Sequence, residues 1–169
     1  MDVAKRGGGV LFNSPVFWTT KDRSIVAAFS FSGPENSTDL LKVYELDSST
    51  LETIGAPFEH AQAITCLALS FDCALLASAS YYDNTIKLWA FESRQLLASF
   101  DVHNIQTLIL SPNSRQLAYT TYHQFNVHVC DIPRDILARV WPTQATRSVC
   151  IFAIYIHLWA LTRPVNRCA

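Results

Sequence analysis

Charged side chains are scarce in this chain, and neither sign dominates. Lysine and arginine number 13 and aspartate and glutamate 14 among 169 residues, so the formal net charge is −1. Proteins that bind nucleic acid usually present a basic patch to the phosphates, and here Lys and Arg do not cluster beyond Lys5 and Arg6. We therefore expect no nucleic-acid partner. Because half of the residues are hydrophobic, the chain can fold as one domain with a core.

Paired cysteines and phosphate-binding loops are missing as well. The five cysteines form no CxxC pair, so we expect free thiols in a reducing compartment and a cytoplasmic location. The glycines of "RGGGVLF" lack the spacing of a phosphate-binding or dinucleotide-binding loop, and we expect no cofactor. The apolar run Val10–Phe12 is too short for the core of a signal peptide, which agrees with the cytoplasmic location.

Helical periodicity is scarce before residue 134. Apolar residues come in short runs rich in β-branched and aromatic types, separated by Ser, Asn, Asp, Gly or Pro clusters. This pattern is typical of strands and turns. We expect strands at residues 16–20, 24–31, 40–46, 63–70, 74–80, 85–91, 95–100, 105–111, 116–122 and 126–132.

These strands recur as a repeated unit. "ITCLALSFDCALLASAS" aligns without a gap to "IQTLILSPNSRQLAYTT" when Ser70 is placed on Ser111, an offset of 41 (111 − 70), which also carries Trp89 onto Cys130. An earlier, less regular copy aligns at an offset of 50 from Ala27 to Ala77 and of 45 from Tyr44 to Trp89.

A four-strand unit of about 41 to 45 residues is typical of a blade of a β-propeller. The predicted fold is all-β, with three four-stranded blades and room for a fourth, incomplete one. We expect a flexible lead-in at residues 1–9, repeats at 10–139 (10–56, 57–100 and 101–139), and an apolar tail at 140–169.

The stretch "LLASASYYDNTIKLWA" resembles the central segment of a WD40 repeat. In that family a His precedes the first strand, a Ser lies in the second, an Asp sits in the following turn and a Trp closes the third. Here His60, Ser78, Asp83 and Trp89 stand at those positions, and the resemblance implies that they form a structural tetrad. The partial array also resembles the WD40 arrays of fungal multidomain signalling proteins.

The flanking repeats depart from the family pattern. The third has His103, but Tyr119, Gln124 and Cys130 stand in the places of Ser, Asp and Trp, and the first has Tyr44 where Trp is expected. WD40 propellers typically have seven blades, so the resemblance implies a fragment of a larger propeller. Such a fragment needs further blades or self-association to close, and as an isolated monomer we expect it to be weakly stable.

Ser78, His60 and Asp83 are also the residue types of a hydrolytic triad. The GxSxG elbow of many hydrolases is absent, and Ser78 lies in the apolar run "LLASAS". Buried polar groups need hydrogen bonds, which a series from the Trp89 indole through Ser78 and His60 to Asp83 supplies. We therefore expect no enzyme. A serine hydrolase that uses Ser78 and His60 is the less favoured alternative.

Two other sets of side chains are candidate sites. His128 and Cys130 lie close together in sequence, with His123 nearby, but without a second pair of ligands we expect no metal site. Four tyrosines fall at or near the turns of successive repeats, where a propeller presents its faces. We expect them to form a contact patch for a partner or to pack inside: Tyr81, Tyr82, Tyr119 and Tyr122.

The segment 148–162, "SVCIFAIYIHLWALT", carries no formal charge. It falls short of the roughly 20 residues that a helix needs to span a bilayer. Three alternatives stay open, in decreasing order: part of a further blade, an exposed tail left by truncation or altered splicing, or a short membrane-associating tail.

The resemblance to WD40 proteins implies a rigid platform that binds proteins or peptides. We therefore predict a non-catalytic scaffold or recognition module. The alternative is a tail-anchored membrane adaptor that uses residues 148–162.

Overall fold

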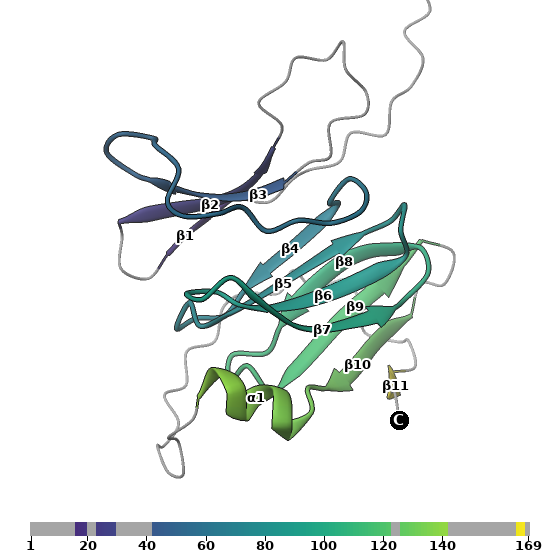
Figure 1. Ribbon diagram of the computed structural model, residues 1–169. Coiled ribbons are helices and arrows are strands. Elements are labelled where there is room, and N and C mark those ends of the chain that lie inside the picture. The colour runs from purple at the N-terminus through teal and green to yellow at the C-terminus, as the bar shows by residue number, and fades with distance from the viewer. Residues whose placement is uncertain (1–15, 20–22, 30–41, 123–125, 142–164, 168–169) are drawn as a thin grey trace, which may run out of the picture.

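The computed structural model describes residues 16–19, 23–29, 42–122, 126–141 and 165–167, whose strands form three sheets in succession (Figure 1). The first sheet holds β1 (Val16–Trp18), β2 (Ser24–Phe29) and β3 (Lys42–Asp47). The second holds β4 (Cys66–Leu69), β5 (Leu75–Ser80), β6 (Thr85–Ala90) and β7 (Gln95–Asp101). The third holds β8 (Ile105–Leu110), β9 (Gln116–Thr121), β10 (Val127–Asp131) and β11 (Val165–Arg167), and α1 (Arg134–Val140) follows β10.

Each of the ten predicted strand segments overlaps one of the strands β1 to β10. Strands β1 to β10 pair with their chain neighbours in antiparallel fashion inside each sheet, as expected where tight turns connect them. The prediction of an all-β chain with three successive sheets is confirmed.

The register of the second and third sheets confirms the predicted repeat. The pair Leu67↔Ser78 of the second sheet reappears at the predicted offset as Leu108↔Tyr119 of the third. The alignment predicted for the first sheet is wrong in one strand. Ala27 is paired with Tyr44 and shares its face, whereas Trp89 is paired with Leu76, which leaves Ala77 on the other face. Ala27 therefore cannot match Ala77 if Tyr44 matches Trp89.

The outer strands of the first and third sheets depart from a regular blade. In the first sheet, residues 52–58 run beside β3 through two isolated bridges, Leu46↔Thr53 and Val43↔Phe58. In the third, Pro133 lacks the backbone N–H that a paired strand needs, and α1 begins directly after it. Strand β11 takes the outer place instead and is parallel to β10. The fourth strand expected before residue 139 is therefore contributed by residues 165–167.

Two apolar cores join the three sheets. One lies between the first and second sheets and contains Val26, Val43, Leu76 and Trp89. The other lies between the second and third sheets. All six residues of β5 are buried, and they alternate between the two cores because successive side chains of a strand point to opposite faces. The second sheet is thus covered on both sides.

Polar contacts reinforce both junctions. Arg94, in the turn between β6 and β7, forms an ion pair with Glu45 of β3. Its guanidinium lies 4.6 Å from the ring centre of Phe58. On the other side, the Cys66 thiol donates to the Gln106 carbonyl at 3.1 Å, and burial raises the pKa of that thiol. The three sheets are therefore held by more than apolar contact.

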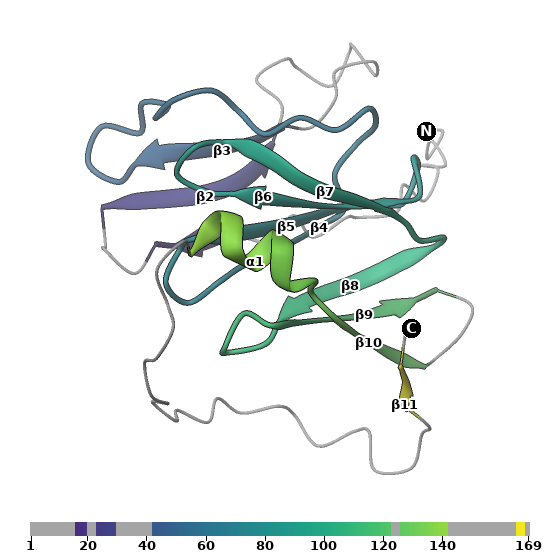
Figure 2. The same cartoon turned by 60° about the horizontal axis from the view of Figure 1, so that its bottom comes forward.

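Helix α1 lies beside the second and third sheets (Figure 2). Its buried Ile136 joins the core between them, Arg139 donates to the Leu97 carbonyl at 3.2 Å, and the Trp141 indole donates to Asp72 at 2.8 Å. Among the described residues, no helix is long and apolar enough to cross a membrane. The segment 148–162 lies outside the described residues.

The cysteines are not all free. Cys66 and Cys73 are free thiols, as predicted. Cys130 is disulfide-bonded, so the prediction of a free thiol is wrong there. The other half of this disulfide lies outside the described residues, as do Cys150 and Cys168. Disulfides are rare in reducing compartments, so the disulfide at Cys130 weakens the prediction of a cytoplasmic location.

Replacing Leu88 by Ala should lower the free energy of unfolding by about 2 to 5 kcal/mol. Leu88 is 0% exposed in the core between the second and third sheets, and the cavity left by the shorter side chain has no easy way to collapse. Urea denaturation measures the loss. Leu96→Ala on the adjacent strand is the matched control, because Leu96 is 41% exposed. Equal losses in the two variants would contradict the assignment of the core.

Candidate functional site

The structure brings the four residues of the predicted tetrad together. His60 lies just before β4, Ser78 on β5, Asp83 in the turn that follows, and Trp89 on β6. The Trp89 indole donates to Ser78 Oγ at 2.8 Å, and His60 Nε2 lies 2.6 Å from the same oxygen. His60 Nδ1 lies 3.4 Å from Asp83 Oδ2.

One placement of protons gives every donor of this group an acceptor. The Ser78 hydroxyl accepts from Trp89 and donates to His60 Nε2, and His60 Nδ1–H donates to Asp83. This placement requires an uncharged imidazole. Burial lowers the pKa of His60 to about 4, and the nearby Lys87 ammonium adds to the shift, which together outweigh the opposing effect of Asp83. His60 is therefore neutral near pH 7.

The burial of its side chains distinguishes this group from a catalytic triad. Ser78 is 0% exposed and His60 3% exposed, and sheet strands flank Ser78 on both sides. A catalytic serine must reach its substrate beside a group that stabilises the oxyanion. A substrate cannot reach the Ser78 hydroxyl in this structure, which favours a bracing role over catalysis.

The same group fixes the turn between β5 and β6. Asp83 Oδ1 accepts hydrogen bonds from the Thr85 amide at 3.1 Å and the Thr85 hydroxyl at 2.6 Å. The buried Ser80 hydroxyl accepts from the amides of Tyr82 at 3.3 Å and Asp83 at 3.4 Å. The turn that presents Tyr81 and Tyr82 is therefore tied to the interior of the second sheet.

Two asparagines connect this turn to the third sheet. Asn84 accepts from the Val102 amide through its carbonyl at 2.8 Å and from the Asn104 amide through its side chain at 3.3 Å. Asn104 in turn accepts from the Tyr122 amide at 2.8 Å. Both asparagines adopt positive φ, 54° and 56°, which Asn tolerates better than most residues. Sequence reasoning missed this link, although Asn in a turn was the available signal.

The four predicted tyrosines separate into two environments. Tyr82 and Tyr122 are 53% and 55% exposed. Tyr81 is half-buried and lies edge-on to Tyr82 at 5.6 Å between ring centres. Tyr119 lies within β9, half-buried, and its ring stacks on His128 at 4.9 Å. Tyr81 and Tyr122 match each other in the repeat and occupy equivalent turns, whereas Tyr119 occupies the place of Ser78.

A cavity of about 330 Å³ opens at this end of the second and third sheets. His128 contributes a buried Nε2 that has no hydrogen-bond partner among the described residues. The lining is Asp101, Val102, His103, Asn104, Tyr119, Thr121 and His128. We call the tyrosine-bearing turns and this cavity the loop end. Within the described part of the chain, no group of three or more His, Cys, Asp or Glu side chains is placed to hold a metal ion.

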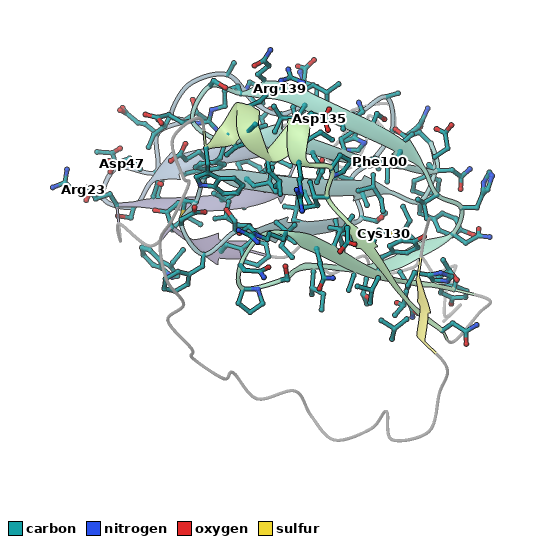
Figure 3. The ribbon with its side chains drawn as sticks, turned by 90° about the horizontal axis from the view of Figure 1, so that it is seen from below. Arg23, Asp47, Phe100, Cys130, Asp135 and Arg139 are labelled. Atoms are coloured by element: carbon teal, nitrogen blue, oxygen red, sulfur yellow. The ribbon has the colours of Figure 1, made fainter. Side chains whose placement is uncertain are left out.

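The third sheet does not repeat the tetrad. His103 is exposed, Tyr119 replaces the serine, and Cys130 has no indole N–H to donate. Cys130 and Phe100 instead line a second, apolar cavity of about 220 Å³ between the second and third sheets (Figure 3). Gln124 and His123 lie outside the described residues.

Three successive sheets packed face to face define part of a β-propeller. The solved structures that resemble this chain include the β-propeller domain of Cps50 (Swd1) from Myceliophteria thermophila, at 18% identity over 69% of this chain and 35% of that one, with a TM-score of 0.57. They also include the WD40 repeats of RRP9, at 21% identity over 68% and 34%, with a TM-score of 0.52. At these identities the likeness establishes the fold.

A family profile matches one segment of the chain. The profile described as WD domain, G-beta repeat matches residues 52–90, which begin beside the first sheet and end with the third strand of the second. This segment matches the WD40 repeat, as predicted, and the chain has the fold of part of a propeller of the WD40 type.

Two further comparisons bear on this assignment. A hydrazine synthase chain of Kuenenia stuttgartiensis is also similar, at 13% identity over 79% of this chain and 37% of that one, with a TM-score of 0.56. No curated protein sequence gives a significant match. The chain spans about a third of the length of the structures that it matches.

Replacing Asp83 by Ala should lower the free energy of unfolding by about 1 to 3 kcal/mol. The change leaves the buried His60 Nδ1–H and the Thr85 amide without their acceptor. Thermal and urea denaturation measure the loss. Asp83→Asn is the control, because its amide oxygen can still accept and the loss should be smaller. An unchanged melting temperature in Asp83→Ala would argue against a bracing role.

Stability should fall as the pH drops from about 6.5 towards 4. The pKa of His60 is depressed to about 4 in the folded chain, while an unfolded histidine titrates near 6.5, so the unfolded state binds the proton first. The loss between pH 7 and pH 5 should be about 2 kcal/mol. Urea denaturation across this range, with His60→Gln as the reference, isolates the contribution of His60. Identical pH slopes in the two proteins would contradict the depressed pKa.

Proposed function

We propose that this chain is a non-catalytic module that binds a protein or peptide at its loop end and forms part of a larger propeller. The observation that carries the proposal is the pair Tyr82 and Tyr122, more than half exposed on turns that hydrogen bonds hold in place. A rigid, exposed aromatic side chain loses little entropy on binding, and tyrosine is enriched among the residues that dominate interface energies.

The loop end also offers a recess beside these rings. The 330 Å³ cavity is large enough for one side chain of a partner. Asp101 and His103, both exposed, can supply polar contacts in it. We place Tyr119 in the wall of this recess rather than on the exposed patch, since its ring is stacked on His128.

The tetrad has a supporting part in this proposal. We assign to His60, Ser78, Asp83 and Trp89 the role of holding the turn that presents Tyr82. Burial of Ser78 weighs against the serine hydrolase alternative. The membrane adaptor alternative depends on residues 148–162, which lie outside the described structure. A cytoplasmic location stays a prediction, with two free thiols in its favour and the disulfide at Cys130 against it.

Replacing Tyr82 and Tyr122 by Ala should weaken partner binding about tenfold or more, as expected for interface residues that dominate affinity. The measurement uses the full chain against a phage-displayed library of random dodecapeptides, followed by titration of the selected peptides. Both side chains are exposed, so the variant should melt as the parent does.

The matched control is Phe71→Ala. Phe71 is 79% exposed in the turn between β4 and β5, at the opposite end of the second sheet. Peptides whose affinity falls with Phe71→Ala, and not with the tyrosine variant, would place the binding surface at that opposite end. Failure of any peptide to be enriched would count against a peptide-recognition function.

A further inference from the structure

Each sheet of this chain has two faces with different partners along the ring. We call the face that looks towards the next sheet along the chain the front face and the opposite one the rear face. The front face of the second sheet packs on the rear face of the third, and the front face of the first packs on the rear face of the second. This leaves the rear face of the first sheet and the front face of the third outside both cores.

The rear face of the first sheet is mostly apolar, and its third row pairs Phe29 with Lys42 at one end of the sheet. Val16, Ala27 and Tyr44 are aligned across its three strands, as are Trp18, Ile25 and Leu46. Val16 is 64% exposed and Trp18 61% exposed. Neither row contains a charged residue. A face of this composition is typical of a surface that packs against another sheet.

The front face of the third sheet repeats the one that the second sheet already uses for packing. Ala68, Ala77 and Leu88 are paired in the buried core between the second and third sheets. Their counterparts at the repeat offset are Ile109, Ala118 and Val129, which are paired in the same way. Ile109 is 58% exposed. Of the other positions on this face, Cys66, Ala79 and Ile86 become Thr107, Thr120 and Val127. Leu75 and Ala90 become Gln116 and Asp131, which are hydrogen-bonded to each other at 2.8 Å, so the row at one end of the face is polar.

The two uncovered faces therefore have the chemistry of the two sides of one sheet-to-sheet junction. One is a front face whose counterpart in this chain packs on a rear face, and the other is a rear face of aromatic and branched residues. Every copy of the chain carries one of each. A second copy can cover both at once. Its rear face would pack on the front face of the first copy, and its front face on the rear face of the first copy.

We propose that two copies of this chain associate head to tail through these faces and close a ring of six sheets. Three sheets from each copy make six, within the four to eight blades of closed propellers. A head-to-tail contact repeats without limit unless the rotation closes it, and with three sheets per copy one partner suffices. This proposal rests on the proposed role as part of a larger propeller and names a second copy of this chain as the partner that completes the ring. It leaves the loop end free.

Analytical ultracentrifugation of the full chain between about 1 and 100 µM tests the proposal, because a dissociation constant within or below this range gives a measurable fraction of dimer. We expect a species of about twice 19.0 kDa. Trp18→Glu and Ile109→Lys should each raise the dissociation constant at least tenfold. Both side chains are exposed in the single chain, so the variants should keep its circular dichroism spectrum. Phe71→Lys is the control and should associate as the parent does.

Mixing the two variants distinguishes head-to-tail contact from other modes. In a mixed pair, one junction joins two unaltered faces and the other joins the introduced acid to the introduced base, so association should recover. A chain that stays monomeric at the highest concentration would overturn the proposal. Dissociation by Trp18→Glu alone would indicate pairing of two first sheets, and masses that rise beyond two chains would exclude a closed ring.

These outcomes are independent of partner binding at the loop end. Peptide binding that depends on Tyr82 in a strictly monomeric chain would retain the proposed function and reject the ring. A dimer without peptide binding would support the ring and reject the proposed function.

Discussion

The double burial of the second sheet is the constraint on which the rest of this structure depends. Strand β5 has no solvent-facing side, so every polar atom placed on it needs a partner inside the protein. Ser78 and Ser80 satisfy this demand by accepting hydrogen bonds from Trp89 and from the amides of the next turn. The polar interior and the turn geometry at the loop end are thus two results of one requirement.

The neutral state of His60 follows from the same burial. An imidazolium in this position would lose its hydration, and Asp83, at 3.4 Å, does not compensate for that loss. A triad-like arrangement of Ser, His and Asp is therefore compatible with a role in stability alone. Position in the fold separates the two roles, because the residue types are the same in both.

Local pattern was enough to predict much of this structure. Short apolar runs predicted β1 to β10, and an ungapped repeat predicted the register relating the second and third sheets, because both depend on neighbours in sequence. The first sheet could not be aligned in the same way. A polar insertion separates Ala27 from Tyr44, so the sequence alone does not show that these two residues lie on the same face of the sheet. The link from Asn84 through Asn104 to Tyr122 depends on three loops meeting in space, which no single segment encodes.

The order in which the sheets form is the remaining consequence of β11. The second sheet joins four strands through short turns, so its contacts are local. The third sheet gains its outer strand from Val165–Arg167, which a long stretch of chain separates from the end of β10 at Asp131. Closing a longer loop costs more chain entropy. We therefore expect folding to run outward from the second sheet, with β11 attaching after the strands that short turns connect.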